Sequence, residues 1–134
     1  MKKILHVEDD RNMQALVRVI LSKAGYETAA AADAMQGVMM ARNFAPDLII
    51  LDLMLPAGGG QSVLERVRNL STTCHVPILI YSATPRENFP GGASLGDDVH
   101  YLQKPADKAV LLAAVRELLG DAPPDGKHVT QPLP

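Results

Sequence analysis

Short apolar runs alternate with segments of helical periodicity along most of this chain. The most hydrophobic run, Leu48–Leu51, ends abruptly at Asp52. Continuous apolar runs of this length are typical of strands that are buried on both faces of a sheet. The predicted strands are Ile4–Val7, Tyr26–Ala30, Asp47–Leu51, Pro77–Tyr81 and Tyr101–Gln103.

Four segments place apolar residues three and four positions apart, as amphipathic helices do. The clearest segment begins at Asn12, and Gly25 is placed to end it. Asp10, Asp33 and Asp107 precede three of the segments and are suited to cap them. The predicted helices cover about residues 12–24, 33–43, 63–70 and 107–119.

Two further segments contain residues that interrupt regular structure. Pro56–Gly60 includes three consecutive glycines, which predict a flexible loop. Residues 83–100 contain two prolines and three glycines, so we expect at most one or two helical turns there. Elsewhere, strand and helix alternate along the chain, which predicts an α/β fold with a parallel sheet and right-handed crossovers.

The composition fits one globular domain. The chain has 134 residues, of which 47% are apolar and 21% charged, and its formal net charge is −2. Such a balance provides no basic surplus for nucleic acid, and no apolar stretch approaches the ~20 residues that cross a bilayer. The single cysteine, Cys74, excludes an internal disulfide. We expect a cytoplasmic protein with one domain over residues 1–120 and a flexible tail or linker over residues 121–134.

Polar side chains follow four of the predicted strands. Glu8 and Asp9 come after the first strand, Asp52 after the third, Ser82 after the fourth and Lys104 after the fifth. Taken singly, each has an ordinary explanation as a helix cap, a turn former or a surface residue. In an open parallel sheet, however, the carboxyl ends of the strands meet at the edge where ligands bind. We therefore expect all five residues to converge on one site.

The three carboxylates at this edge require a counter-ion. At a separation of about 4 Å and an effective dielectric constant near 20, each pair repels by roughly 4 kcal/mol. Oxygen ligands favour Mg²⁺, which keeps some of its waters and accepts phosphate oxygens. A lysine and a hydroxyl beside such a cation suit a phosphoryl group in transfer, with Asp52 as the nucleophile.

These residues and their order resemble the receiver domain of bacterial two-component response regulators. The resemblance covers about residues 3–119. It implies a flavodoxin-like (βα)5 fold, with a doubly wound, five-stranded parallel sheet in the order 2-1-3-4-5. It is carried by the segments Ile4–Asp10, Pro46–Pro56, Ser82–Ala83 and Lys104–Pro105.

The resemblance assigns the metal and the phosphoacceptor. It implies that Asp52 accepts a phosphoryl group from a sensor histidine kinase or a histidine phosphotransfer protein. It also implies that Asp9, Asp52 and the backbone carbonyl of Met54 ligate Mg²⁺ directly, while Glu8 acts mainly through a bound water.

The resemblance also implies a switch. Ser82 would move to hydrogen-bond the aspartyl phosphate, Tyr101 would change its rotamer with Ser82, and Lys104 would pair with another phosphoryl oxygen. The Lys104–Pro105 bond is expected to be cis. Output would pass through an unknown protein target, with a homodimer as an option, and through neither nucleic acid nor membrane.

Two alternative functions depend on residues that depart from the expected pattern. An aspartyl phosphohydrolase needs a second acid two residues after the nucleophile, and that position is Met54. The same apolar residue cannot orient an attacking water, so we expect slow self-dephosphorylation rather than enzymatic turnover. The irregular segment over residues 85–96 replaces the family's usual fourth helix, which keeps open a receiver-like interaction module that works without phosphorylation.

Overall fold

The computed structural model describes residues 1–55, 59–85, 98–121 and 131–132. Its centre is one sheet with the order β2-β1-β3-β4-β5-β6, and adjacent strands from β2 to β5 run parallel. The predicted α/β class and the order 2-1-3-4-5 of the parallel strands are therefore confirmed. The strands are β1 (Lys3–Val7), β2 (Glu27–Ala31), β3 (Leu48–Leu51), β4 (Ile78–Ser82), β5 (Val99–Gln103) and β6 (Gln131–Pro132).

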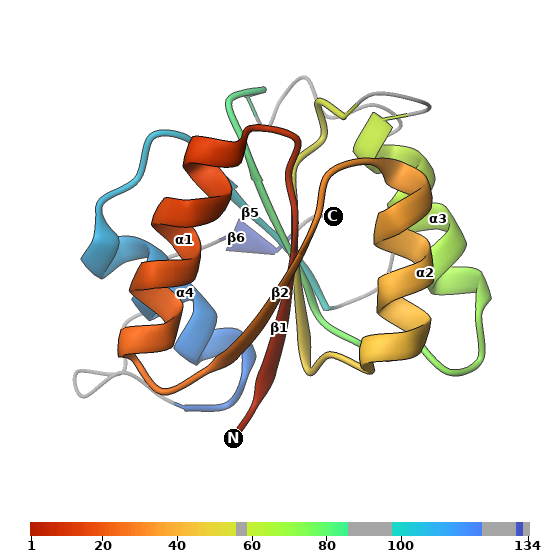
Figure 1. Cartoon of the computed structure of the whole chain (residues 1–134), viewed down its shortest axis with the longest axis horizontal. Helices are drawn as coiled ribbons and strands as arrows, with labels where there is room; N and C mark the ends of the chain where they lie inside the picture. Colours follow the sequence, from red (N-terminus) through yellow and green to blue (C-terminus); the bar gives the residue numbers. More distant parts are fainter. Residues whose placement is uncertain (56–58, 86–97, 122–130, 133–134) are drawn as a thin grey trace.

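Helices cover both faces of the sheet, as the doubly wound prediction requires. Figure 1 shows α1 and α4 on one face and α2 and α3 on the other. Among the described residues, no helix is both long enough and apolar enough to cross a membrane. The helices are α1 (Arg11–Lys23), α2 (Ala34–Phe44), α3 (Gly59–Asn69) and α4 (Lys108–Leu118).

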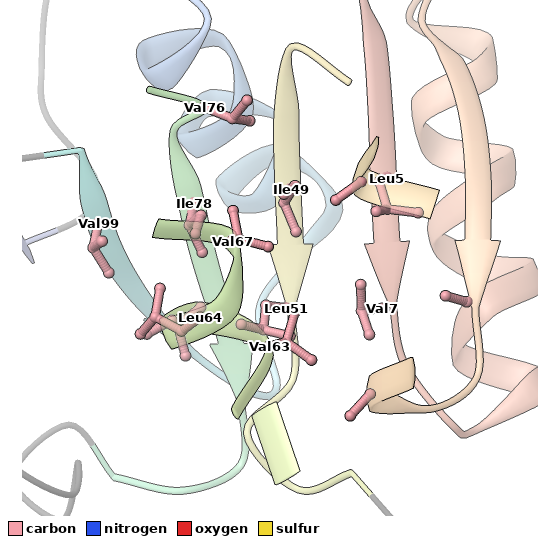
Figure 2. Close-up of a cluster of buried hydrophobic side chains, with 14 of the residues drawn as sticks. Leu5, Val7, Ile49, Leu51, Val63, Leu64, Val67, Val76, Ile78 and Val99 are labelled. Atoms are coloured by element: carbon pink, nitrogen blue, oxygen red, sulfur yellow. The ribbon is translucent and has the colours of Figure 1, made fainter. Parts of the chain in front are cut away.

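Alternation along the strands divides the core into two hydrophobic clusters. In β3, Ile49 and Leu51 point toward the cluster under α2 and α3, which Figure 2 shows in detail. Leu48 and Ile50 point toward the cluster under α1 and α4. All four side chains are fully buried, which explains why this strand is the most continuous apolar run in the sequence.

Three aspartates occupy the predicted N-cap positions. The side chains of Asp10 and Asp33 accept hydrogen bonds from backbone amides in the first turns of α1 and α2. Asp107 precedes α4, but its side chain makes no capping hydrogen bond. Gly25 follows α1 with a φ of 96°, a left-handed conformation that glycine adopts without steric cost. Local capping thus places the ends of α1 and α2 close to where the sequence predicted them.

The sequence did not predict β6. This two-residue strand pairs antiparallel with β5, so that Pro132 lies opposite His100 and Gln131 opposite Tyr101. It falls within residues 121–134, which were expected to form a polar tail. A proline cannot donate to a strand ladder, which is consistent with a position at the edge of the sheet. The irregular segment predicted over residues 85–96 lies outside the described residues except for Pro85, as do residues 56–58 and 122–130.

The glycine loop prediction is wrong for Gly59 and Gly60, which form the first turn of α3. A Cβ atom on Gly60 would lie 2.1 Å from the carbonyl oxygen of Asp52 and 2.7 Å from the Cα of Leu53. The Gly60 amide also donates to the Leu53 carbonyl at 2.9 Å. Glycine at this position therefore permits direct backbone contact between α3 and the segment that carries Asp52.

His6 lies in β1 and is 4% exposed. Its Nδ1 has no hydrogen-bond partner among the described residues. The pKa of His6 is lowered to about 4, mainly by burial and also by the positive charge of Lys104, while the negative charge of Asp52 opposes the shift. The imidazole is therefore neutral at physiological pH.

We predict that Gly60→Ala destabilises the fold by about 3 kcal/mol, because the new methyl group meets backbone atoms that cannot rotate away. Gly37→Ala in α2 is the matched control, since its Cβ would approach a side chain, that of Val7 at 3.0 Å, rather than backbone atoms. The intrinsic helix preference of alanine, about 1 kcal/mol over glycine, also favours the control. Urea unfolding measures both, and equal losses of stability would contradict the proposed backbone contact.

We predict that His6 makes the protein less stable as the pH falls from 6.5 to 4. In this window the unfolded state, with a His6 pKa of about 6.5, binds more protons than the folded state, with a pKa of about 4. The contribution amounts to at most about 3 kcal/mol. The measurement is urea unfolding of the wild type and of His6→Val across this pH range. The variant should lose less stability, and parallel curves would show that His6 is not responsible.

Candidate functional site

Parallel pairing places Glu8 beside Asp52. The register pairs Val7, the last residue of β1, with Leu51, the last residue of β3. Glu8 and Asp52 follow these partners directly, and the Asp52 amide donates to the Val7 carbonyl at 3.0 Å. Two acids that are distant in the chain therefore leave the sheet at one point of its carboxyl edge.

Ser82 and Lys104 reach the same edge from the next pair of strands. Ser82 ends β4 opposite Gln103, which ends β5. The Lys104 amide then donates to the Ser82 carbonyl at 2.8 Å, which continues the ladder by one residue. The bond between Lys104 and Pro105 is cis, as expected from the resemblance.

The predicted acidic cluster is present. One carboxylate oxygen from each of Glu8, Asp9 and Asp52 lies within 4.8 Å of the others. Glu8 and Asp52 are buried, whereas Asp9 is exposed. The three carboxylates thus form a group with one open side, and their oxygens are the ligand type that Mg²⁺ prefers.

Lys104 occupies the centre of the charge distribution. Its ammonium donates to Oε1 of Glu8 and, at 3.0 Å, to Oδ2 of Asp52. It also lies 5.5 Å from the centre of the Tyr81 ring, within the range of a cation–π interaction. The side chain of Lys104 is only 14% exposed, so water screens these attractions weakly. One ammonium is therefore shared by two buried carboxylates and offsets part of their charge.

The surroundings of Asp52 favour its ionised form. Burial by itself raises the pKa of this carboxyl, but hydrogen bonds from the Met54 amide, Lys104 and Ser82 outweigh burial and leave the pKa below its usual value. The Met54 amide donates to Oδ1 at 3.0 Å. An ionised carboxylate with a directed oxygen is suited to attack an electrophile such as phosphorus.

The pKa of Glu8 shifts in the opposite direction, above its usual value. Burial raises its pKa, and this effect exceeds the opposing effect of the hydrogen bond from Lys104. For Lys104 itself, burial lowers the pKa, but the hydrogen bonds to Glu8 and Asp52 outweigh burial and raise it. The lysine is therefore firmly cationic, and of the two buried acids Asp52 is the more readily ionised.

The two predicted switch residues are both buried. Ser82 is fully buried, and its hydroxyl accepts a hydrogen bond from the Thr84 amide at 3.3 Å. A hydrogen bond from Ser82 also helps to lower the pKa of Asp52. Tyr101 is 5% exposed and belongs to the hydrophobic cluster under α2 and α3. Ser82 thus touches the predicted phosphoacceptor, whereas Tyr101 occupies the core.

Met54 contributes to the site through its backbone. Its amide binds Asp52, while its side chain is 65% exposed. The thioether offers no hydrogen-bond donor and only a weak acceptor. Met54 is the residue two positions after Asp52, where an aspartyl phosphohydrolase would need a second acid, and its side chain is exposed and apolar.

Three supporting residues were missed by the sequence reasoning. The Gln14 side chain donates to the Glu8 carbonyl, the Tyr81 ring lies beside Lys104, and Gly60 contacts the backbone of Asp52. In the sequence, Gln14 is an amide residue on a predicted helix and Tyr81 an aromatic residue in a predicted strand, and neither pattern indicates a functional role. Only Gly60 carried a usable signal, because a glycine in the first turn of a helix often marks a close backbone approach.

The assembled groups fit a divalent cation and an anionic substrate. Glu8, Asp9 and Asp52 supply oxygen ligands, and Lys104 supplies a fixed positive charge beside them. Phosphoryl transfer depends mainly on positioning and on charge neutralisation, both of which these groups can provide. All five predicted strand-end residues are thus brought to one edge.

Comparison with known proteins agrees with this geometry. The family model of the response regulator receiver domain matches residues 4–116. The DNA-binding dual master transcriptional regulator RpaA of Synechocystis sp. is 40% identical over 121 residues, which are 89% of this chain and 49% of RpaA. The polar-differentiation response regulator DivK of Brucella anthropi is 26% identical over 121 residues, which are 90% of this chain and 98% of DivK.

A solved structure carries a metal in a similar fold. The receiver domain of the sensor histidine kinase PA1611 from Pseudomonas aeruginosa holds a magnesium ion in its active site cleft. It is 28% identical to this chain, superposes with a TM-score of 0.77, and the match covers 89% of this chain and 98% of that domain. This chain spans about half the length of the first curated relatives that it matches. Fold, site and sequence match together establish that the chain belongs to the response regulator receiver domain family.

Proposed function

We propose that this receiver domain accepts a phosphoryl group on Asp52 and thereby switches its contacts with other proteins. The observation that carries the proposal is the state of Asp52, a buried carboxylate with a lowered pKa that is bound by Lys104 and Ser82 beside two further acids. No other carboxylate among the described residues combines these features. The phosphoryl donor would be a phosphohistidine on a sensor histidine kinase or a phosphotransfer protein.

The proposed reaction is an in-line transfer. An oxygen of ionised Asp52 attacks the phosphorus of the phosphohistidine, the P–N bond breaks, and the imidazole nitrogen leaves with the bonding electron pair and takes up a proton. The product is an aspartyl phosphate. Because Asp52 is already ionised, the step requires no base on this chain.

Glu8, Asp9, Asp52 and the Met54 carbonyl would hold Mg²⁺. When bound, the cation supplies positive charge that offsets both the clustered carboxylates and the phosphoryl oxygens. Lys104 is already close to Asp52 and would pair with a phosphoryl oxygen, while Ser82 would donate to another. Glu8 would then lose part of its bond to Lys104 and keep the cation as its partner.

The conformational change that follows phosphorylation would begin at Ser82 and Tyr101. Movement of the Ser82 side chain toward the phosphoryl group would vacate space in the core, and the Tyr101 ring would follow it. The exposed Met54 cannot orient an attacking water, so the aspartyl phosphate should persist. Output would pass to a downstream protein or to a second copy of the chain, and the domain would act in signalling rather than as an enzyme.

We predict that acetyl phosphate and Mg²⁺ add one phosphoryl group to the purified protein and that Asp52→Asn abolishes the adduct. Intact-mass spectrometry measures the adduct, which should be stable in acid and labile in base. Asp107→Asn is the matched control, because Asp107 is exposed and makes no capping hydrogen bond, and this variant should be modified like the wild type.

Other outcomes distinguish the alternatives. Absence of an adduct in the wild type, with the domain still able to bind a partner, would favour a module that works without phosphorylation. Steady release of phosphate without accumulation of the adduct would favour a phosphohydrolase. An adduct that persists in Asp52→Asn would place the phosphoacceptor elsewhere.

We predict that Lys104→Met lowers the stability of the fold and makes this stability more dependent on Mg²⁺. Removal of the ammonium leaves Glu8, whose side chain is 2% exposed, beside Asp52 without its bound cation. Loss of one partner of a buried ion pair costs roughly 3 to 5 kcal/mol, and partial exposure of Lys104 puts the expected loss at or below the lower figure. Millimolar Mg²⁺ should restore much of this stability.

Thermal unfolding with Mg²⁺ and with EDTA checks this expectation. The increase in melting temperature on addition of Mg²⁺ should be larger for Lys104→Met than for the wild type. Lys108→Met, at an exposed position four residues away, should respond like the wild type. An equal response of all three proteins would mean that the ammonium and the cation do not share the same carboxylates.

A further inference from the structure

A cleft lies between α1 and the edge of the sheet formed by β1 and β2. Its outer part has a volume of about 400 Å³ and is lined by Arg11, Arg18 and Gln36 among others. Its inner part has a volume of about 140 Å³ and reaches His6. Arg18 and Ala30 line both parts, so the two adjoin. None of these residues belongs to the phosphoacceptor site.

Small side chains on β2 create the space. The register pairs Thr28 with Ile4 and Ala30 with His6, so these residues share the face of the sheet that α1 covers. Ala30 is exposed although it faces a helix, because its methyl group does not reach across the cleft. A larger residue here would be favoured in a strand and would fill the space.

The ring of a buried histidine lines the inner part of the cleft. His6 is 4% exposed, and its Nδ1 has no hydrogen-bond partner among the described residues. Val17 and Leu21 of α1 form an apolar wall on the same cavity. The His6 ring lines this cavity and has no hydrogen-bond partner among the described residues, so it is the group there that is available to a ligand with a complementary polar atom.

The outer part carries unpaired positive charge. Within the described part of the chain, neither Arg11 nor Arg18 forms an ion pair or a hydrogen bond with another residue. The guanidinium group presents several donors in a plane and binds carboxylates in a bidentate manner. A ligand that extends outward from the inner cavity would therefore meet cations at the mouth.

We propose that this cleft binds a small organic carboxylate with a ring-sized apolar body and a hydroxyl or similar polar group at its far end. The carboxylate pairs with Arg18, the body fills the inner part beside Val17 and Leu21, and the polar group hydrogen-bonds to His6. The inner volume of about 140 Å³ is close to that of a cavity that holds benzene, about 150 Å³, which sets the size of the body.

The cleft adjoins the phosphoacceptor site but does not depend on it. Gln14 lines both parts of the cleft and donates to the Glu8 carbonyl. Binding requires neither phosphorylation nor Asp52, so it is measured without a phosphoryl donor. A failure of binding would leave the proposed phosphoacceptor role unaffected, and a failure of phosphorylation would leave this proposal standing.

The test is a titration of the whole chain with 4-hydroxybenzoate, followed by the backbone amide resonances in NMR. We expect saturable shifts in residues 14–18 and 28–30. Three comparison probes each lack one feature: benzoate lacks the hydroxyl, 4-hydroxybenzyl alcohol lacks the carboxylate, and inorganic phosphate lacks the apolar body. Benzoate and the alcohol should each bind roughly tenfold more weakly, because each loses one hydrogen-bonded group. Phosphate should produce no saturable shift in residues 28–30.

Three variants assign the contacts. Arg18→Gln should weaken binding of 4-hydroxybenzoate about tenfold. Arg66→Gln, at an exposed arginine of α3 on the opposite face of the sheet, should bind like the wild type. Ala30→Ile should fill the cleft and abolish binding while the protein remains folded. His6→Val should remove the preference for 4-hydroxybenzoate over benzoate.

Several results would overturn the proposal. These are the absence of a saturable shift, shifts confined to other parts of the chain, undiminished binding in folded Ala30→Ile, or equal shifts with inorganic phosphate. The last result would mean that the arginines attract any anion and that the inner cavity plays no part.

Discussion

The bridge from Lys104 to Glu8 and Asp52 is the interaction on which the site depends. Two carboxylates with little access to water could not remain charged side by side without a nearby cation, and this lysine supplies one from another strand. Its effect is unequal, because Asp52 has additional hydrogen-bond donors and Glu8 has fewer. The arrangement keeps Asp52 ionised and makes Glu8 the more sensitive of the two acids to loss of a counter-ion.

The sheet makes this bridge possible. Glu8, Asp52 and Lys104 directly follow three strands that are dispersed along the chain, and parallel pairing brings the carboxyl ends of these strands to one edge. Fully buried aliphatic residues in β3 and β4 hold the strands in register. A slip of one residue would turn Asp52 toward the opposite face, so the apolar pattern of the core also determines the geometry of the charges.

Much of this organisation could be predicted from the sequence. Alternating apolar runs and helical periodicity predicted the α/β class with a parallel sheet, the family resemblance implied the strand order, and polar residues after four strands predicted the site. The contacts of Lys104 with Glu8 and of Gln14 with the Glu8 carbonyl could not be predicted, because they depend on side-chain reach across the sheet. The pairing of β6 with β5 and the cleft at Ala30 depend likewise on tertiary packing that no local pattern encodes.

The contact between Gly60 and Asp52 limits how the site can move. The start of α3 lies directly against the carbonyl oxygen of Asp52, with no side chain between them to deform. Any displacement of the Asp52 backbone in that direction would have to push the whole helix, whose buried residues are anchored in the core. Displacement of the Asp52 backbone toward α3 is therefore opposed by the packing of the whole helix. The absence of a side chain at Gly60 thus makes the Asp52 backbone rigid on the side that faces α3.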